Sequence, residues 1–144
     1  MIRIGTVSSV NAAQATVRVT FADQDDIVSD ELPIVFLQTN SAKVYAMSAV
    51  GDMVVCVFDD DQGFCIGSYY GEDDKPPTTK SSQLGVWFED GSFVFYDSET
   101  KILNIKAMSG IVVEGKTTIK APDGVRIEGN LTVTGKISHG GISP

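Results

Sequence analysis

Hydrophobic and polar residues alternate along the last third of the chain in short pairs. The pairs run from about Lys101 to Ile137, with glycines between them: Leu103/Ile105, Ile111/Val113, Thr117/Ile119, Val125/Ile127, Leu131/Val133 and a final Ile137. A period of two predicts short strands with one apolar face, and strands this short cannot bury that face alone. We therefore expect the same segment of other copies to wrap around a common axis, so that the inward residues stack into one core and neighbouring chains pair every strand edge.

Short strands also account for the first half of the chain. Alternating or apolar runs predict strands at residues 2–10, 15–21, 32–37, 53–58 and 64–70, and no segment before residue 80 has a helical period. Five short strands with glycine-bearing turns are typical of a small closed barrel of the OB type. The predicted fold is therefore all-β, with an N-terminal OB-fold barrel followed by an intertwined β-structure.

A polar segment separates the two patterns. Residues 71–80 contain a double proline and no apolar side chain, which indicates a linker of limited flexibility. Beyond it, apolar runs at residues 86–88 and 93–96 flank Asp90 and Gly91, a dipeptide that favours a hairpin. We expect residues 1–74 to form the barrel, residues 75–84 the linker and residues 85–144 the repeat with its tip.

Charge narrows the range of partners. The chain has 144 residues and a net charge of −8. Residues 1–80 hold twelve acidic and five basic side chains, whereas residues 81–144 hold seven and six. Because nucleic-acid binding depends on neutralising phosphates, we expect no DNA or RNA partner.

Two cysteines and the first residues of the chain indicate the cellular compartment in which the protein folds. Cys56 and Cys65 form no C-x-x-C unit and fall in two predicted strands, where we expect buried thiols rather than a disulfide or a metal site. No signal-peptide core follows Met1, and no apolar stretch approaches the roughly 20 residues of a membrane helix. We expect folding in a cytoplasm without Sec-type export.

Several short motifs, in this order and spacing, resemble one family over nearly the whole chain. They are IGTV at residues 4–7, VRV at 17–19, LP at 32–33, VGD at 50–52, Gly67 with Tyr69 and Tyr70 before the double proline, FEDGS at 88–92, FYD at 95–97, and EGNLTVTG at 128–135. With the apolar repeat, they resemble the baseplate assembly protein V family, the central spike of contractile phage tails.

The resemblance implies a structural protein rather than an enzyme. It implies a homotrimer whose three barrels form a collar on the tail hub, capping the tail tube. Its tails would wind into a triple-stranded β-helix that is driven through the host outer membrane or envelope when the sheath contracts. The expected location is the tail baseplate of a virion, assembled in the host cytoplasm. The spike of a phage-derived bacteriocin or secretion machine fits equally well.

Two sets of site residues follow from the repeat and the resemblance. We expect seven residues to point to the trimer axis: Ile111, Val113, Ile119, Val125, Ile127, Leu131 and Val133. The family's spike often ends in a His-x-His pair from each chain that holds iron, but here position 137 is Ile and only His139 is present. Three copies of His139 would still supply three imidazoles to an iron or zinc ion. The alternatives are a solvent-exposed histidine and a tip capped by a separate protein.

Two other classes of protein compete with this interpretation. An enzyme requires paired carboxylates in a cleft or a nucleophile with a base, whereas Glu89 and Asp90 sit at a predicted hairpin tip. A carbohydrate-binding OB module would stack sugars on aromatic side chains such as Phe64, Tyr69 and Tyr70. We expect these aromatics to serve the core or subunit contacts instead.

Overall fold

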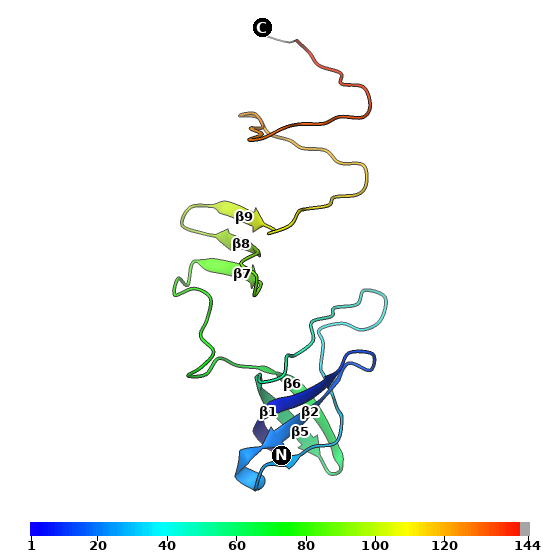
Figure 1. Cartoon of the computed structure of the whole chain (residues 1–144), viewed down its shortest axis with the longest axis vertical. Helices are drawn as coiled ribbons and strands as arrows, with labels where there is room; N and C mark the ends of the chain where they lie inside the picture. Colours follow the sequence, from blue (N-terminus) through cyan, green and yellow to red (C-terminus); the bar gives the residue numbers. More distant parts are fainter. Residues whose placement is uncertain (142–144) are drawn as a thin grey trace.

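Residues 1–141 are described by the computed structural model, and they form an all-β structure. The sheets are antiparallel, and the helical content of residues 1–141 is one short 3-10 turn, η1 (Ala22–Gln24). Figure 1 shows the first sheet at one end of the long axis and the end of the chain at the other. The predicted all-β class is confirmed. Within residues 1–141 the structure contains no helix that is long and apolar enough to cross a membrane.

The first sheet has six strands and curls back on itself. Its strands are β1 (Ile2–Asn11), β2 (Thr16–Phe21), β3 (Ile27–Val28), β4 (Leu32–Pro33), β5 (Met53–Asp59) and β6 (Gln62–Ser68). The order is β3-β2-β1-β5-β6, and β4 pairs with β2. Just after β4, Ile34 forms a parallel bridge with Cys65, and the Val35 N–H donates to the Cys65 carbonyl at 2.9 Å. These contacts join β2 to β6 through β4.

The interior of this sheet is the buried core of the chain. Alternate residues of β1, β2, β5 and β6 point inward, and the core consists of Val7, Val17, Val19, Phe21, Leu32, Val54, Cys56 and Cys65. Cys56 and Cys65 lie opposite each other across β5 and β6 as free thiols. Small β-branched residues and thiols fill the narrow space between the curled strands.

The predicted third strand at residues 32–37 is wrong beyond its first residues. The strand β4 ends at Pro33, and Ile34 contributes a single bridge. From residue 35 the chain leaves the sheet as a long loop, in which Leu37 is 95% exposed. The apolar run predicts a strand, but after the Val35 hydrogen bond to β6 it has no partner strand. Leu37 faces solvent, and half-buried Phe36 stacks on Tyr45 within the loop. Residues 23–31, where the sequence pattern predicts no strand, contain the short strand β3.

The second sheet has three strands, β7 (Gln83–Trp87), β8 (Phe93–Asp97) and β9 (Ile102–Lys106). The expected hairpin is present. Its tip is formed by Gly91 at φ 92° and by Asp90, whose Oδ1 accepts a hydrogen bond from the Ser92 N–H at 2.9 Å. The first strand of this sheet begins at Gln83, inside the range expected as linker.

The chain after β9 forms no strand within residues 107–141. It rises from the second sheet as an extended, winding trace (Figure 1). The strands predicted around residues 111–133 are therefore not paired within a single copy. Residues 142–144, the last part of the predicted tip, lie outside the described residues.

Candidate assembly surface

One face of the second sheet is entirely apolar. Leu84, Tyr96 and Leu103 lie in one row across the three strands, and Val86, Val94 and Ile105 lie in another. Paired residues share a face, and the two rows are two residues apart, so all six lie on the same side. Their exposed fractions run from 41 to 77%. We call this set the apolar face: Leu84, Val86, Val94, Tyr96, Leu103 and Ile105.

The opposite face of the same sheet is packed by its own side chains. Trp87 stacks on Phe95 with ring centroids 5.2 Å apart, and Phe93 meets Phe95 edge-on at 5.1 Å. The Lys106 ammonium lies 5.7 Å from the centre of the Phe93 ring, within cation–π range. A side chain at Gly85 would overlap the backbone of Val94 and Phe95. Aromatic contacts thus cover the middle of this face, although Ile102 at its end is 54% exposed, while the apolar face stays open throughout.

A buried carboxylate holds one end of this sheet. The Gln83 side-chain amide donates to Asp97 Oδ2 at 3.1 Å, and the Glu99 N–H donates to Asp97 Oδ1 at 2.9 Å. The hydrogen bond from Gln83, followed by that from Glu99, holds the pKa of the Asp97 carboxyl below its usual value. Asp97 therefore joins β7 to the turn that leads into β9.

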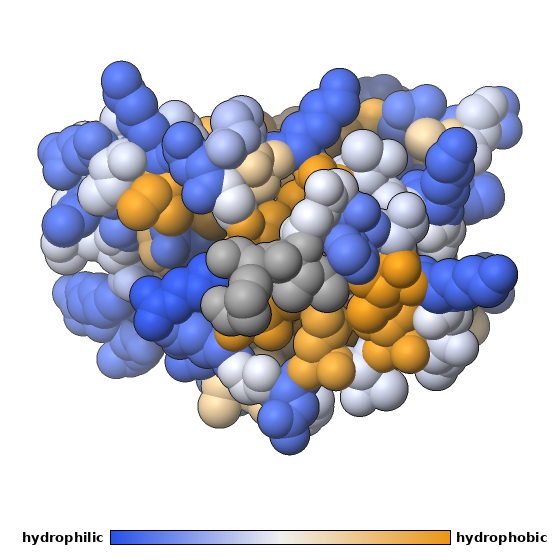
Figure 2. All heavy atoms as spheres, turned by 90° about the horizontal axis from the view of Figure 1, so that it is seen from above, coloured by the Kyte–Doolittle hydropathy of each residue, from blue (hydrophilic) through white to orange (hydrophobic). Residues whose placement is uncertain are grey.

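The seven residues expected at the trimer axis are all exposed in a single chain. Their exposed fractions run from 47% at Val133 to 72% at Val113, and none belongs to the buried core. Hydrophobic side chains lie open on the molecular surface when the molecule is viewed from above the first view (Figure 2). A single copy therefore leaves the predicted core residues in water, where apolar surface is unfavourable by roughly 25 cal/mol per Å².

Glycines form the corners of this segment. The Gly124 N–H donates to the Ala121 carbonyl at 2.9 Å, and Gly124 has a φ of 99°. Such a φ is strained for a residue with a side chain. Five glycines separate the apolar pairs. Four of them have a positive φ: Gly110, Gly115, Gly124 and Gly129. The fifth, Gly135, does not. The corners recur between the apolar pairs.

His139 is exposed close to the end of the described chain. Among residues 1–141, no three or more His, Cys, Asp or Glu side chains gather into a group that would hold a metal. A single copy offers one imidazole here, so the expected iron or zinc site requires three copies. It stays a prediction.

Of the residues considered for catalysis and sugar binding, Tyr69 and Tyr70 line one cleft together with Asp52 and Asp74. Asp90 accepts the backbone N–H of Ser92, and this hydrogen bond lowers the pKa of its carboxyl, in line with a turn role. Phe64 lies within β6, whereas Tyr70 lines a cleft with the linker prolines Pro76 and Pro77. Phe64 does not line the cleft that Tyr69 and Tyr70 share, so the three aromatics do not form one platform in the described residues.

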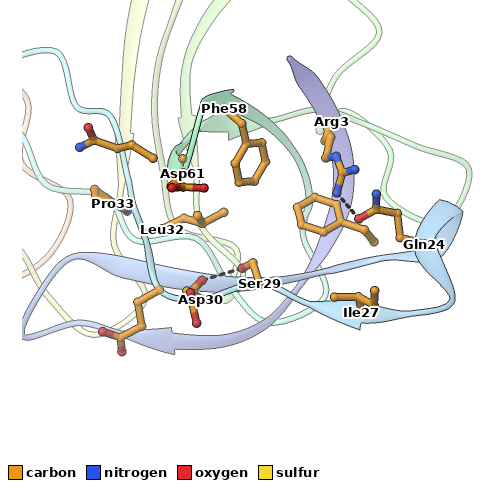
Figure 3. Close-up of a pocket in the computed structure, with 13 residues that line it drawn as sticks. Arg3, Gln24, Ile27, Ser29, Asp30, Leu32, Pro33, Phe58 and Asp61 are labelled. Carbon is orange, nitrogen blue, oxygen red and sulfur yellow. Dashed lines mark hydrogen bonds between the residues drawn. The ribbon is translucent and has the colours of Figure 1, made fainter.

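The first sheet has a cavity of about 420 Å³ at one end (Figure 3). Arg3 stands over the rings of Phe21 and Phe58, 5.4 and 5.9 Å from their centres, and donates a hydrogen bond to the Gln24 side chain. Asp30 and Asp61 line the same cavity. The rings and Gln24 hold the guanidinium in place, so Arg3 joins β1 to the loop after β2.

The thiol pair in the core is closed to solvent. The hydrogen bond between Cys56 and Cys65, together with burial, raises the pKa of the Cys56 thiol. A raised pKa disfavours the reactive thiolate. The expected buried thiols are observed, with both cysteines free.

Four residues of the apolar face were missed by the sequence analysis. The sequence analysis placed Leu103 and Ile105 in the apolar repeat. It did not recognise that residues 84 and 86, and residues 94 and 96, alternate in the same way and share a face with them. A period-two count across all three strands would have found them: Leu84, Val86, Val94 and Tyr96. Comparison with known proteins adds nothing further, because no protein-family model and no curated protein matches this chain.

Proposed function

We propose that this chain is the central spike of a contractile tail. In this proposal three copies form a collar of OB-type barrels on the tail hub, and their tails wind into a triple-stranded β-helix. One observation carries the proposal: exposed apolar residues recur from the apolar face into an extended segment without strand partners of its own in residues 107–141.

Exposed apolar residues in such number require a partner. Large open apolar surfaces on soluble proteins mark sites of association, and an extended chain leaves backbone N–H and C=O groups without partners in the chain. Identical copies satisfy both needs, because they stack equivalent side chains and pair equivalent backbone groups. The number three comes from the resemblance to the baseplate assembly protein V family.

The topology of the first sheet supports the barrel part of the proposal. Its pairings lead from β1 to β2, through β4 to β6, and back through β5 to β1. A small closed barrel of five main strands is the architecture of the OB type. Such a barrel gives each tail a rigid base on the hub.

The proposed action is mechanical. Contraction of the sheath drives the spike through the host envelope, so the protein must resist bending and pulling. Ladders between chains suit this task, because many hydrogen bonds have to break together before the chains separate. The tip is completed by a metal at three copies of His139 or by a separate capping protein.

Electron microscopy of tail particles tests this proposal. Cells carrying the gene are induced to make particles, and gold-labelled antibodies against the chain are applied. The proposal predicts label at the far end of the tail, and a capsid on the same particle would favour a phage over a bacteriocin or secretion machine. Label on free protein only, with bare tail ends, would contradict the proposal.

A further inference from the structure

In the first sheet, the strands β1, β5 and β6 carry apolar residues on their outward face as well as on their inward face. Along β1, Gly5 and Val7 are buried, and the outward positions that alternate with this inward set include the apolar Ile2 and Ile4, which are 72% and 56% exposed. The outward positions of β5 and β6 continue this surface. We call the set the barrel wall: Ile2, Ile4, Thr6, Met53, Val55, Val57, Phe64 and Ile66.

When one face of a sheet is in water, residues along each strand normally alternate between polar side chains on that face and apolar side chains on the core face. The barrel wall holds no charged residue, and seven of its eight residues are apolar. A sheet that is apolar on both faces is typical of one covered on both. The exposure of Ile2 and Ile4 indicates that none of residues 1–141 of the same copy covers this side fully.

The second apolar surface of the barrel is the loop after β4. We call residues 35–50 the arm, which extends away from the strands of the first sheet (Figure 1). Phe36 stacks on Tyr45 with ring centroids 6.1 Å apart, and the Val44 N–H donates to the Gln38 carbonyl at 3.0 Å. These contacts give the arm a shape of its own. Leu37, near the start of the arm, is 95% exposed.

The segments that form these two surfaces contain no carboxylate of their own in a strongly acidic chain. Two carboxylates lie at their borders: Asp23 lines a pocket beside Ile2 and Ile4 of the barrel wall, and Asp52 accepts the Ala49 N–H at the base of the arm. No Asp or Glu occurs in residues 1–22 or 32–51, nor in residues 53–58 or 62–71. The acidic side chains of this half lie mainly at residues 23–31 and 59–61. Copies with a charge of −8 repel one another where carboxylates meet, so contacts between copies are favoured at surfaces that hold few of them.

Cyclic symmetry requires two different surfaces. In a ring of three copies each contact is heterologous, because one patch of a copy meets a different patch of the next. Each barrel offers such a pair. We propose that the arm of one copy packs on the barrel wall of the next copy and so closes the collar. This inference rests on the proposed trimer and assigns its barrel contacts to a second copy of this chain.

Cross-linking between introduced cysteines tests the contact. Leu37→Cys on the arm and Ile4→Cys on the wall are combined in one full-length chain and treated with a short bis-maleimide. Both positions are exposed, so the changes leave the core intact, and Cys56 and Cys65 are buried from the reagent. The matched control combines Leu37→Cys with Ala13→Cys, which lies exposed in the turn between β1 and β2.

We expect covalent dimers and trimers on a denaturing gel for the arm and wall pair, at least tenfold above the control. A trimer by light scattering whose arm and wall pair yields no more covalent dimer than the control would overturn this inference alone. The same result is expected if the barrel wall binds the tail hub and not the arm of the next copy. A monomer by light scattering would overturn the proposed trimer itself, so the two failures are distinguishable.

Discussion

Val94 pairs with Ile105 across β8 and β9, and both side chains are exposed on the same face of the sheet. A three-stranded sheet gains stability by covering its hydrophobic face. Here the opposite face is covered by aromatic contacts around Phe95, whereas the Val94 side is open. The pair therefore marks where the proposed core between copies begins, ahead of the tail repeat.

Ile105→Asp should prevent assembly. It would place one carboxylate per copy in the apolar core, at several kcal/mol for each charge that stays ionised. The matched control is Asn104→Asp, on the other face of the same strand, which should leave assembly intact. Sizing chromatography with light scattering measures both variants, and equal masses for the two would show that the apolar face is not an interface.

Ile119→Asp tests the inward register of the tail in the same way, and Ile127→Asp should behave alike. We expect the Ile119 variant to stay unassembled and Thr118→Asp, one residue away, to assemble. A shift of one residue turns every side chain of a strand to the opposite side. The reverse result, with assembly lost only for Thr118→Asp, would mean that the opposite set of residues faces the axis.

Gly124→Ala should weaken the tail without changing its core. Position 124 has a φ of 99°, which an alanine adopts only with strain of about 1 kcal/mol per chain. Gly135→Ala is the control, since Gly135 has no positive φ and open space around it. Thermal unfolding should show a lower midpoint for the Gly124 variant only, and matching midpoints would argue against glycine corners.

Acid should weaken the second sheet through Asp97. Its folded-state pKa is lowered, so its contribution to stability is complete above the ordinary aspartate pKa of about 4. That contribution is lost as the pH falls through the lower folded value. Fluorescence of Trp87, the single tryptophan, reports the unfolding. Asp97→Asn should remove this part of the acid sensitivity, and an unchanged pH profile in the variant would exclude the role.

The barrel strands were predictable because their burial alternates. Val17 and Val19 are buried on either side of exposed Arg18, as the sequence pattern indicates. The arm was not predictable, because Val35 and Leu37 are spaced two residues apart, as apolar residues on one face of a strand are. Hydrophobic pattern marks a residue that needs a partner, and it does not say whether that partner is in the same chain.

In the tail, too, the hydrophobic pattern does not say whether a residue's partner is in the same chain. The alternation of Ile111 with Val113 indicates a strand, yet no strand forms there within residues 107–141 of one copy. Strand pairing needs a second backbone, which a single chain does not provide at this point. The glycine corners were predictable, because glycine adopts a positive φ at little cost. The apolar face needed the observed register of β7, β8 and β9.

The most direct test of the account is the absolute mass of the purified full-length chain, measured by light scattering on a sizing column. We predict one species at three times 15.4 kDa that elutes early for its mass, as an elongated particle does. A compact monomer with its apolar residues in solution would contradict the assembly on which the proposed function depends.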